Sequence, residues 1–192
     1  MDITLTGHGV EQFATPRLVG RRLLPADTDF LIELHSTEEV MALHGGARSR
    51  AATEPFVQSN VAHWRHYQFG LYVLSLAEEP DEPIGRAGIR WDRSVTTGPA
   101  VDLSVVLSKH VWGQGIATET MRAMATIGHD LDLPLVAGSE ARHAAARRVL
   151  EKVGFIYGSE FERHSRGWVR YQWPVENPPP ARISRSTAGR PA

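Results

Sequence analysis

Residues 101–119, VDLSVVLSKHVWGQGIATE, decide the fold. The first seven residues are mostly apolar and β-branched, which predicts a strand over 101–107. Gly113 and Gly115 then lead into apolar residues at helical spacing, which predicts a helix over 118–131. A helix N-terminus offers unpaired N–H groups and partial positive charge, so this turn suits a phosphate or diphosphate. The same glycines would equally serve a tight strand-to-helix connection that binds nothing.

Two other phosphate-binding loops do not fit this stretch. The chain has no Gly-Lys-Ser/Thr, which a Walker loop requires. It has no complete Gly-x-Gly-x-x-Gly in a βαβ unit with an acidic residue downstream, which a dinucleotide-binding fold requires. A phosphate site formed by this segment therefore belongs to another class.

Outward from this segment, the hydrophobic pattern predicts a single α+β domain with a mixed sheet. We expect a loose arm or short edge element over 1–14, the domain over 15–176, and a disordered proline-rich tail over 177–192. The expected strands cover 17–24, 71–77, 84–91, 101–107, 134–138, 155–163 and 168–173. The expected helices follow a cap at Asp27, a capping box at 36–39 and a cap at Thr53, and then cover 118–131 and 144–153.

Composition excludes several functional classes. Of the 192 residues, 42% are hydrophobic and 22% charged, and a net charge of −1 indicates neither nucleic acid nor an anionic membrane as partner. The absence of cysteine removes disulfides, thiolate zinc sites and a cysteine nucleophile. Neither a signal peptide nor an apolar run of membrane-spanning length is visible, so we expect a cytoplasmic location.

The residues WGQGIATE (112–119) resemble the acetyl-CoA diphosphate loop of the GNAT superfamily. The form Trp-Gly-x-Gly-x-Ala-Thr-Glu is that of its ribosomal-protein N-terminal acetyltransferase (RimJ/RimL-type) branch. Residues 15–41, IGRAGI (84–89) and RRVLEKVGF (147–155) resemble the same branch, in the expected order. The resemblance implies a GNAT fold, with a mixed, mostly antiparallel sheet that splays between its fourth and fifth strands and carries helices on both faces.

The resemblance also implies how acetyl-CoA, the expected co-substrate, binds. Its pantetheine arm would pair with strand 101–107 like an added strand, and its diphosphate would lie on the amides that follow the glycines. The backbone N–H of Val105 or Val106 would stabilise the oxyanion, and we take Val106 as the catalytic candidate. The expected cofactor contacts are Val105, Leu107, Trp112, Gly113, Gln114, Gly115, Ile116, Ala117, Thr118, His143 and Arg147.

Asp102 is the first candidate for the general base. In the family reaction a free amine attacks the thioester, and since amines are protonated at neutral pH, a base or a water chain must remove a proton. Asp102 matches the position at which the branch often carries Glu, and it would act through water. The alternative is a solvated acid at the strand end, or one paired with an arginine.

The sequence indicates the acid that protonates the leaving thiolate less directly than it indicates the base. Many GNAT enzymes carry Tyr where this chain has Leu150, and the branch carries Asn-x-x-Ser where it has His143 to Ala146. His143 is therefore a candidate acid, or it replaces the Asn as a helix cap or cofactor contact. A helix N-terminus favours the neutral imidazole, which still donates one N–H. A substrate- or solvent-assisted exit is the remaining alternative.

Several other side chains allow two interpretations each. Three arginines would either reach the adenosine phosphates or line a solvated helix face: Arg142, Arg147 and Arg148. His63 and His66 lie three residues apart without a third ligand at a telling spacing, which favours a surface pair over a metal site. Trp64 and Tyr67 have two interpretations: they would line the acceptor pocket, or they would pack in the core. Core packing is the stronger interpretation for Trp64.

The sequence thus predicts an acetyl-CoA-dependent N-acetyltransferase that acts on a protein N-terminus or a small-molecule amine, with no metal. Because the family's Asn, Ser and Tyr are changed, a non-catalytic acyl-CoA-binding or regulatory module is the alternative. A structural protein that does not bind CoA is a third interpretation. The segments expected to choose the acceptor, 27–69, 92–99 and 160–168, contain no decodable motif. Both a monomer and a homodimer are compatible with the sequence.

Overall fold

The computed structural model describes residues 3–6, 11–92, 100–132, 134–163, 165–174 and 183–185. Its strands are β1 (Ile3–Thr6), β2 (Gln12–Ala14), β3 (Leu18–Arg22), β4 (Leu71–Leu76), β5 (Glu79–Asp92), β6 (Ala100–Leu107), β7 (Leu135–Glu140), β8 (Ile156–Arg163), β9 (Arg166–Gln172) and β10 (Ile183–Arg185). Its helices are α1 (Thr28–Ser36), α2 (Glu38–Met41), α3 (Arg50–Tyr67), α4 (Ile116–His129) and α5 (Ala144–Val153), with 3-10 turns η1 (Pro25–Asp27) and η2 (Lys109–Val111).

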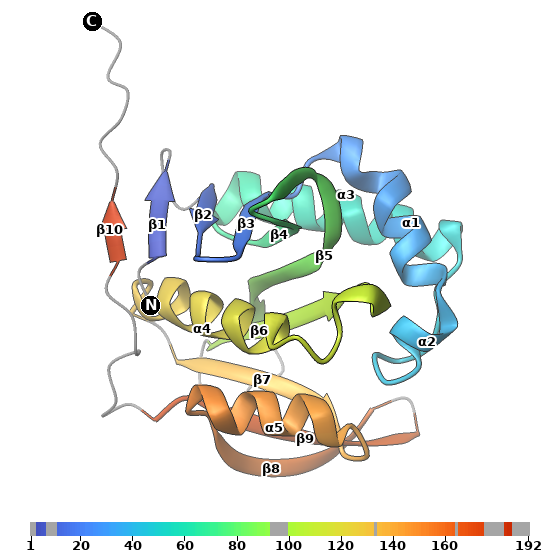
Figure 1. The fold of residues 1–192 in the computed structure, drawn as a ribbon. Coiled ribbons are helices and arrows are strands. Elements are labelled where there is room, and N and C mark those ends of the chain that lie inside the picture. Colours follow the sequence, from blue (N-terminus) through green and yellow to red (C-terminus); the bar gives the residue numbers. More distant parts are fainter. Residues whose placement is uncertain are drawn as a thin grey trace, which may run out of the picture.

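The strands form one mixed sheet in the order β10-β1-β2-β3-β4-β5-β6-β7-β9-β8 (Figure 1). Only the pairs β1–β10 and β6–β7 are parallel, and the other neighbours are antiparallel. The predicted α+β class with a mixed, mostly antiparallel sheet is therefore confirmed. The parallel pair β6–β7 is joined through α4, the helix predicted to follow the glycine turn.

The sheet opens between β6 and β7. Among the described residues, these strands pair only over Val101–Leu103 and Leu135–Ala137. Beyond that point β6 continues to Leu107 beside β5, and β7 continues to Glu140 beside β9. Each strand keeps its outer neighbour while the two separate, so the predicted splay is present.

Helices cover both faces of the sheet (Figure 1). On one face, α4 packs on β5 and β7, because a Cβ at Gly128 would approach Leu135 to 2.9 Å and Ile89 to 3.6 Å. On the other face, α1 and α3 reach β5, since His35 and Phe56 both contact Arg86. Residues alternate between faces along a strand, so Asp102, Ser104 and Val106 share the face of α1 and α3.

Three predicted helix caps differ from the structure. The capping box predicted at 36–39 is absent, because Ser36 is the last residue of α1 and Thr37, which precedes α2, makes no side-chain cap hydrogen bond. Asp27 occupies the N-cap position of α1 but makes no side-chain cap, because its carboxylate accepts hydrogen bonds from Arg21 and from the backbone N–H of Leu24. Thr53 lies inside α3, whose cap is Ser49, with Oγ accepting from the Ala52 N–H. Helix α1 still begins directly after Asp27, whereas the cap of α3 lies four residues before the predicted one, because several nearby polar residues offered similar cap signals.

The two ends of the chain add strands at one edge of the sheet. Part of the expected arm 1–14 forms β1 and β2, which continue the sheet from β3. Within the tail expected to be disordered, residues 183–185 form β10 beside β1. Strand pairing uses backbone groups, so three residues can add to an edge without apolar side chains. The rest of the tail lies outside the described residues.

None of the helices in the described part of the chain combines the length and the apolar character needed to cross a membrane.

Candidate functional site

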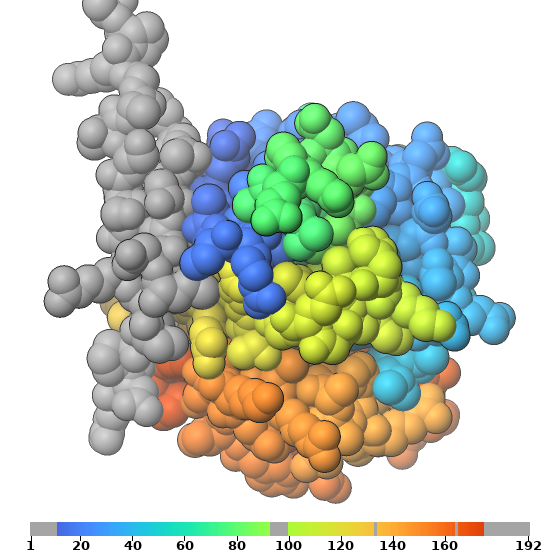
Figure 2. Space-filling model, in the orientation of Figure 1, coloured from blue at the N-terminus to red at the C-terminus, as the bar shows by residue number. Residues whose placement is uncertain are grey.

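The turn before α4 presents unpaired amides to the outside. Gly113 and Gly115 have φ angles of +76° and +79°, a conformation that costs other residues free energy, and Gly115 is the first residue before the helix. No side chain caps this helix, and the first intrahelical donor is Glu119, which bonds the Gly115 carbonyl. Residues 112–115 are exposed. Figure 2 shows the yellow-green segment that contains them on the open front face. The amides at the start of α4 are thus unpaired within the helix, and the glycine turn before them is exposed.

A long-range ion pair that the sequence analysis missed holds this turn in place. Arg17 Nε donates to the buried carboxylate of Glu119 at 2.7 Å, and Thr15 Oγ1 donates to the same group at 2.6 Å. Arg17 Nη1 also donates to the Gln114 carbonyl at 2.8 Å. Although burial opposes it, these hydrogen bonds lower the pKa of Glu119. The only sign of this ion pair in the sequence was that Arg17 and Glu119 both belong to segments that resemble the GNAT family.

The strand β6 presents one edge to the gap between β6 and β7. The Val101 N–H donates to the Pro134 carbonyl, so it points toward β7, whereas the Ser108 N–H points toward Ile84 of β5. Backbone groups alternate in direction, and β6 pairs with β5 without a register shift. The N–H of Val105 therefore points into the gap, and that of Val106 points to β5. The geometry favours Val105, not Val106, as a backbone donor in the gap.

Trp112 lies over the same edge. Its indole Nε1 donates to the Leu107 carbonyl at 2.8 Å, while the side chain remains 46% exposed. The ring therefore limits how far a partner can pair along β6, because the Leu107 carbonyl already accepts a hydrogen bond. Trp112 thus joins the glycine turn to the end of β6, where the Leu107 side chain is buried.

His143 caps α5 at the other side of the gap. Its Nδ1 accepts from the Ala146 N–H at 3.0 Å, so the ring proton lies on Nε2. Burial lowers the pKa of His143, and Arg142 acts in the same direction while Glu140 opposes it. His143 is therefore a neutral donor at pH 7, and its ring contacts that of His44 with centroids 5.5 Å apart. The predicted cap is present, and the position of the family's Tyr is a buried Leu150.

Asp102 lies at the closed end of the splay. It is the register partner of Arg90 on β5 and of Val136 on β7. Burial first, and the nearby Asp92 second, raise the pKa of Asp102 to about 7, although Arg170, Arg163 and Arg90 oppose the shift. A carboxyl group with a pKa near neutrality is suited to proton transfer at physiological pH. Asp102 is half-buried and forms no ion pair with the other described residues, so neither alternative from the sequence describes it.

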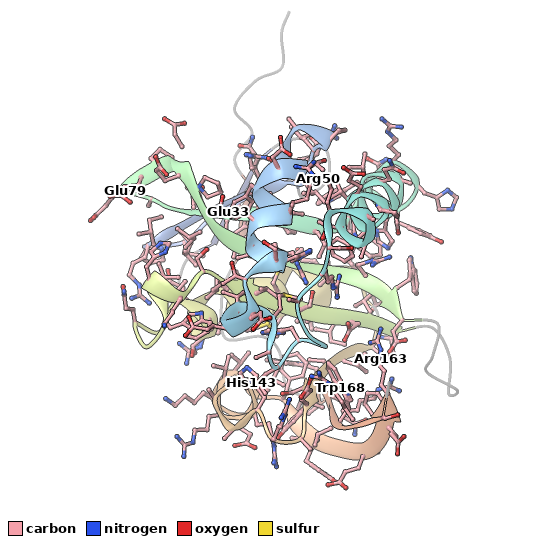
Figure 3. The ribbon with its side chains drawn as sticks, turned by 90° about the vertical axis from the view of Figure 1, so that its right-hand side faces the viewer. Glu33, Arg50, Glu79, His143, Arg163 and Trp168 are labelled. Carbon is pink, nitrogen blue, oxygen red and sulfur yellow. The ribbon has the colours of Figure 1, made fainter. Side chains whose placement is uncertain are left out.

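A cavity of about 440 Å³ opens at the end of β7, lined by Glu140, Ala141, Arg142, Arg166 and Gly167. The buried Glu140 carboxylate pairs with Arg142 at 2.9 Å and with Arg166 at 2.7 Å. Both arginines also donate to the Ala42 carbonyl, after α2. Figure 3 looks onto this side of the molecule, with His143 and Trp168 below α1. The cavity therefore lies between the β7–β9 half and the segment that joins α2 to α3.

The remaining sequence candidates have structural partners. Arg147 donates to the Tyr171 hydroxyl and the Ala141 carbonyl, and Arg148 is exposed. His63 is buried, with Nδ1 at 2.8 Å from the Phe69 carbonyl, so the surface-pair interpretation is wrong for it. His66 is exposed and Tyr67 is half-buried. Trp64 packs in the core, and its Nε1 donates to the Leu71 carbonyl. The described residues contain no group of three or more potential metal ligands.

The chain belongs to the acetyltransferase (GNAT) domain family, whose model matches residues 17–156. Its fold is similar to that of the acetyltransferase from Agrobacterium tumefaciens str. C58, at 21% identity, over 88% of this chain and 96% of that one, with a TM-score of 0.74. It is also similar to RimL, a ribosomal L7/L12 alpha-N-protein acetyltransferase, at 15% identity, over 84% and 92%, with a TM-score of 0.68. A third similar structure is yncA from Salmonella typhimurium with its cofactor acetyl-CoA, at 17% identity, over 84% and 97%, with a TM-score of 0.67. The predicted family and GNAT fold are confirmed, and at these identities the likeness shows the fold alone.

Proposed function

We propose that the chain is an acetyl-CoA-dependent N-acetyltransferase that moves an acetyl group to a primary amine in a ternary complex. One observation carries the proposal: the opening between β6 and β7 lies directly before an uncapped helix N-terminus. Such an opening suits an extended thioester arm, and the helix end suits a diphosphate. The family match and the acetyl-CoA named for yncA support this cofactor, and the activity named for RimL supports an amine acceptor.

The residues that would hold acetyl-CoA fit it chemically. The amides of Ile116, Ala117 and Thr118 have no intrahelical partner, and the exposed glycines leave room beside them. On β6, the backbone of Val105 faces the gap, so it can pair with the amides of the pantetheine arm. Bound acetyl-CoA supplies the acetyl thioester. The Arg17 contact to Gln114 keeps that carbonyl turned away from the anion.

The reaction requires a donor for the thioester oxygen, and we assign it to the Val105 N–H. In the proposed step the amine nitrogen forms a bond to the acetyl carbon, the carbon–sulfur bond breaks, and the amine loses a proton. Negative charge develops on the thioester oxygen during attack, where a fixed backbone donor is most effective. The amine approaches from the face of α1 and α3, because α4 covers the opposite face.

Asp102 is the proposed base, acting through water. Strand residues rise ~3.3 Å each, so Asp102 lies about 10 Å along β6 from Val105, beyond direct hydrogen-bond reach. Ser104 lies between them on the same face as Asp102 and is partly exposed. A water chain past the Ser104 hydroxyl would carry the proton from the amine to Asp102.

His143 is proposed as a hydrogen-bond donor to the cofactor and not as the acid. To protonate a thiolate, a histidine must begin as imidazolium or replace its lost proton at Nδ1. Nδ1 already accepts the Ala146 N–H, so protonation there would break the cap of α5. The departing thiolate is then protonated by solvent while the Nε2–H of His143 stabilises it.

Two measurements test this proposal. A hundredfold excess of acetyl-CoA over Kd should stabilise the fold by ~2.7 kcal/mol, seen as a thermal shift. Acetyl-pantetheine, which lacks the diphosphate, should shift the melting temperature much less at the same concentration. Release of free CoA thiol is then followed with a panel of amines, amino acids and peptides. Binding without turnover across the panel would favour a non-catalytic module, and no binding would contradict both.

A further inference from the structure

Four basic side chains that the proposed reaction does not use lie together on the face of α1 and α3. This basic cluster consists of His35, His44, Arg48 and Arg86. Arg86 is only 6% exposed, and its Nε donates to His35 Nε2 at 2.8 Å. The guanidinium groups of Arg48 and Arg86 each lie 5.1 Å from the centre of the Phe56 ring. Two members, His35 and Arg86, are therefore buried in this face, and His44 and Arg48 lie half-buried beside them.

The two arginines of the basic cluster have no acidic partner. In the part of the chain that the structure describes, neither Arg48 nor Arg86 forms an ion pair. The acid that acts on His44 is Glu140, and both of its carboxylate oxygens are bonded to other arginines. Buried charges are normally paired, so an unpaired buried guanidinium indicates a partner from outside the chain.

The histidines of the basic cluster do not add charge. Burial first, and Arg86 second, lower the pKa of His35 to about 3 and that of His44 to about 4. Burial and then Arg48 lower the pKa of Arg86 to about 9, so Arg86 stays protonated at neutral pH. At pH 7 the cluster therefore holds two cations and two neutral imidazoles, which suits an anion.

The basic cluster adjoins the proposed reaction site. Arg86 is the register partner of Val106, the residue after the proposed oxyanion donor. Cross-strand partners have Cβ atoms ~4.5–5.5 Å apart, so Arg86 leaves the sheet beside the end of β6. On the other side, His44 contacts His143 at the rim of the gap. The cavity of about 440 Å³, within the ~300–1,000 Å³ range of small-molecule sites, is lined by Glu140, which acts electrostatically on His44 of the cluster.

We propose that the acceptor is a small amine that also carries an acid group, of the amino-acid or aminophosphonate class, with its acid group bound by Arg48 and Arg86. This inference rests on the proposed acetyltransferase function and names its substrate class. Guanidinium groups bind carboxylate and phosphonate through charge-assisted hydrogen bonds. Asp102 lies on the same face of β6 and receives the proton that the amine loses. The acid group of a zwitterionic amine thus meets the two arginines, while its amine end is connected to Asp102 through the proposed water chain.

The test compares matched acceptors with the full-length protein and acetyl-CoA. Each set contains an amino acid, its amide and the amine without the acid group, across several side chains, together with 2-aminoethylphosphonate. Short peptides with neutral side chains represent a protein N-terminus. We expect at least one amino acid or aminophosphonate to exceed its neutral counterparts at least about tenfold in kcat/KM, because a charge-assisted contact is lost in the latter.

A pair of variants links the preference to the basic cluster. Arg48→Gln should lower kcat/KM for the acid-bearing amine about tenfold or more while leaving its amide and the thermal shift with CoA unchanged. Arg65→Gln, on the exposed side of α3, is the control and should change neither. Arg48→Lys should restore part of the loss, because it keeps the charge.

Three results overturn the inference. Neutral amines or peptides used as well as amino acids would contradict it and leave the acetyltransferase function standing. An equal loss on acid and amide in Arg48→Gln would show a structural role for this residue. CoA binding without turnover of any acceptor would contradict the proposed function and this inference together.

Discussion

Replacing Asp102 by Asn should stabilise the protein at high pH while it slows the reaction. The pKa of Asp102 is raised from 3.8 to about 7, first by burial and then by Asp92. A raised carboxyl pKa means that the folded state holds a proton that the unfolded state releases. The stability contributed by this proton is present below pH 3.8 and is lost as the pH rises toward about 7.

The size of the effect follows from that difference. At 1.36 kcal/mol per pKa unit the difference corresponds to at most about 4 kcal/mol, and solvent screening of a partly exposed group reduces the expected gain to about 1–2 kcal/mol. We therefore expect the free energy of unfolding, measured with urea, to be higher for Asp102→Asn than for the parent at pH 8. At pH 4 the two free energies should be equal. The parent should also lose kcat/KM below about pH 7, with kcat about 10²–10⁴-fold lower in the variant if Asp102 is the base. Equal stability of the two proteins at pH 8, or an unchanged pH profile of Asp102→Asn, would refute this reasoning.

Further predictions concern the cofactor site. His143→Ala should lose ~1 kcal/mol of stability with the cap, His143→Asn should retain it, and kcat should stay within about tenfold in both; a larger fall in His143→Asn would identify it as the acid. Gly115→Ala should cost ~1 kcal/mol because its φ is +79°, and should raise KM for acetyl-CoA more than it lowers kcat, as steady-state kinetics would reveal. Glu119→Gln should lose ~1–3 kcal/mol in urea unfolding at pH 7 through its bond with Arg17. That loss should shrink at low pH, because the lowered pKa of Glu119 stabilises the fold only at pH values where the carboxylate is ionised. A loss of stability that does not depend on pH would contradict the ion pair.

The features predicted well from the sequence are those encoded by neighbouring residues. The helix over 144–153 matches α5, because apolar spacing and the terminal Gly154 define it locally. The glycine turn was likewise predictable, since a positive φ at Gly113 and Gly115 is a local requirement. Local chemistry therefore predicts the helix α5 and the positive-φ turn before α4.

The features that were missed depend on contacts between distant segments. Arg17 meets Glu119 across 102 residues, and Arg86 meets His35 across 51. No periodicity in either segment indicates such a partner, because the contact exists only once the sheet has formed. The choice between Val105 and its neighbour also required the strand pairing, which fixes the direction of each N–H. The charges of the basic cluster could not be predicted for the same reason, because Arg86 and His35 meet only in the folded sheet.

A crystal structure of the protein with acetyl-CoA is the most direct test of where the cofactor binds. The account predicts diphosphate oxygens within hydrogen-bond distance of the Ile116, Ala117 and Thr118 amides, and the thioester oxygen on the Val105 N–H. Acetyl-CoA bound elsewhere, or with its diphosphate away from the start of α4, would contradict it.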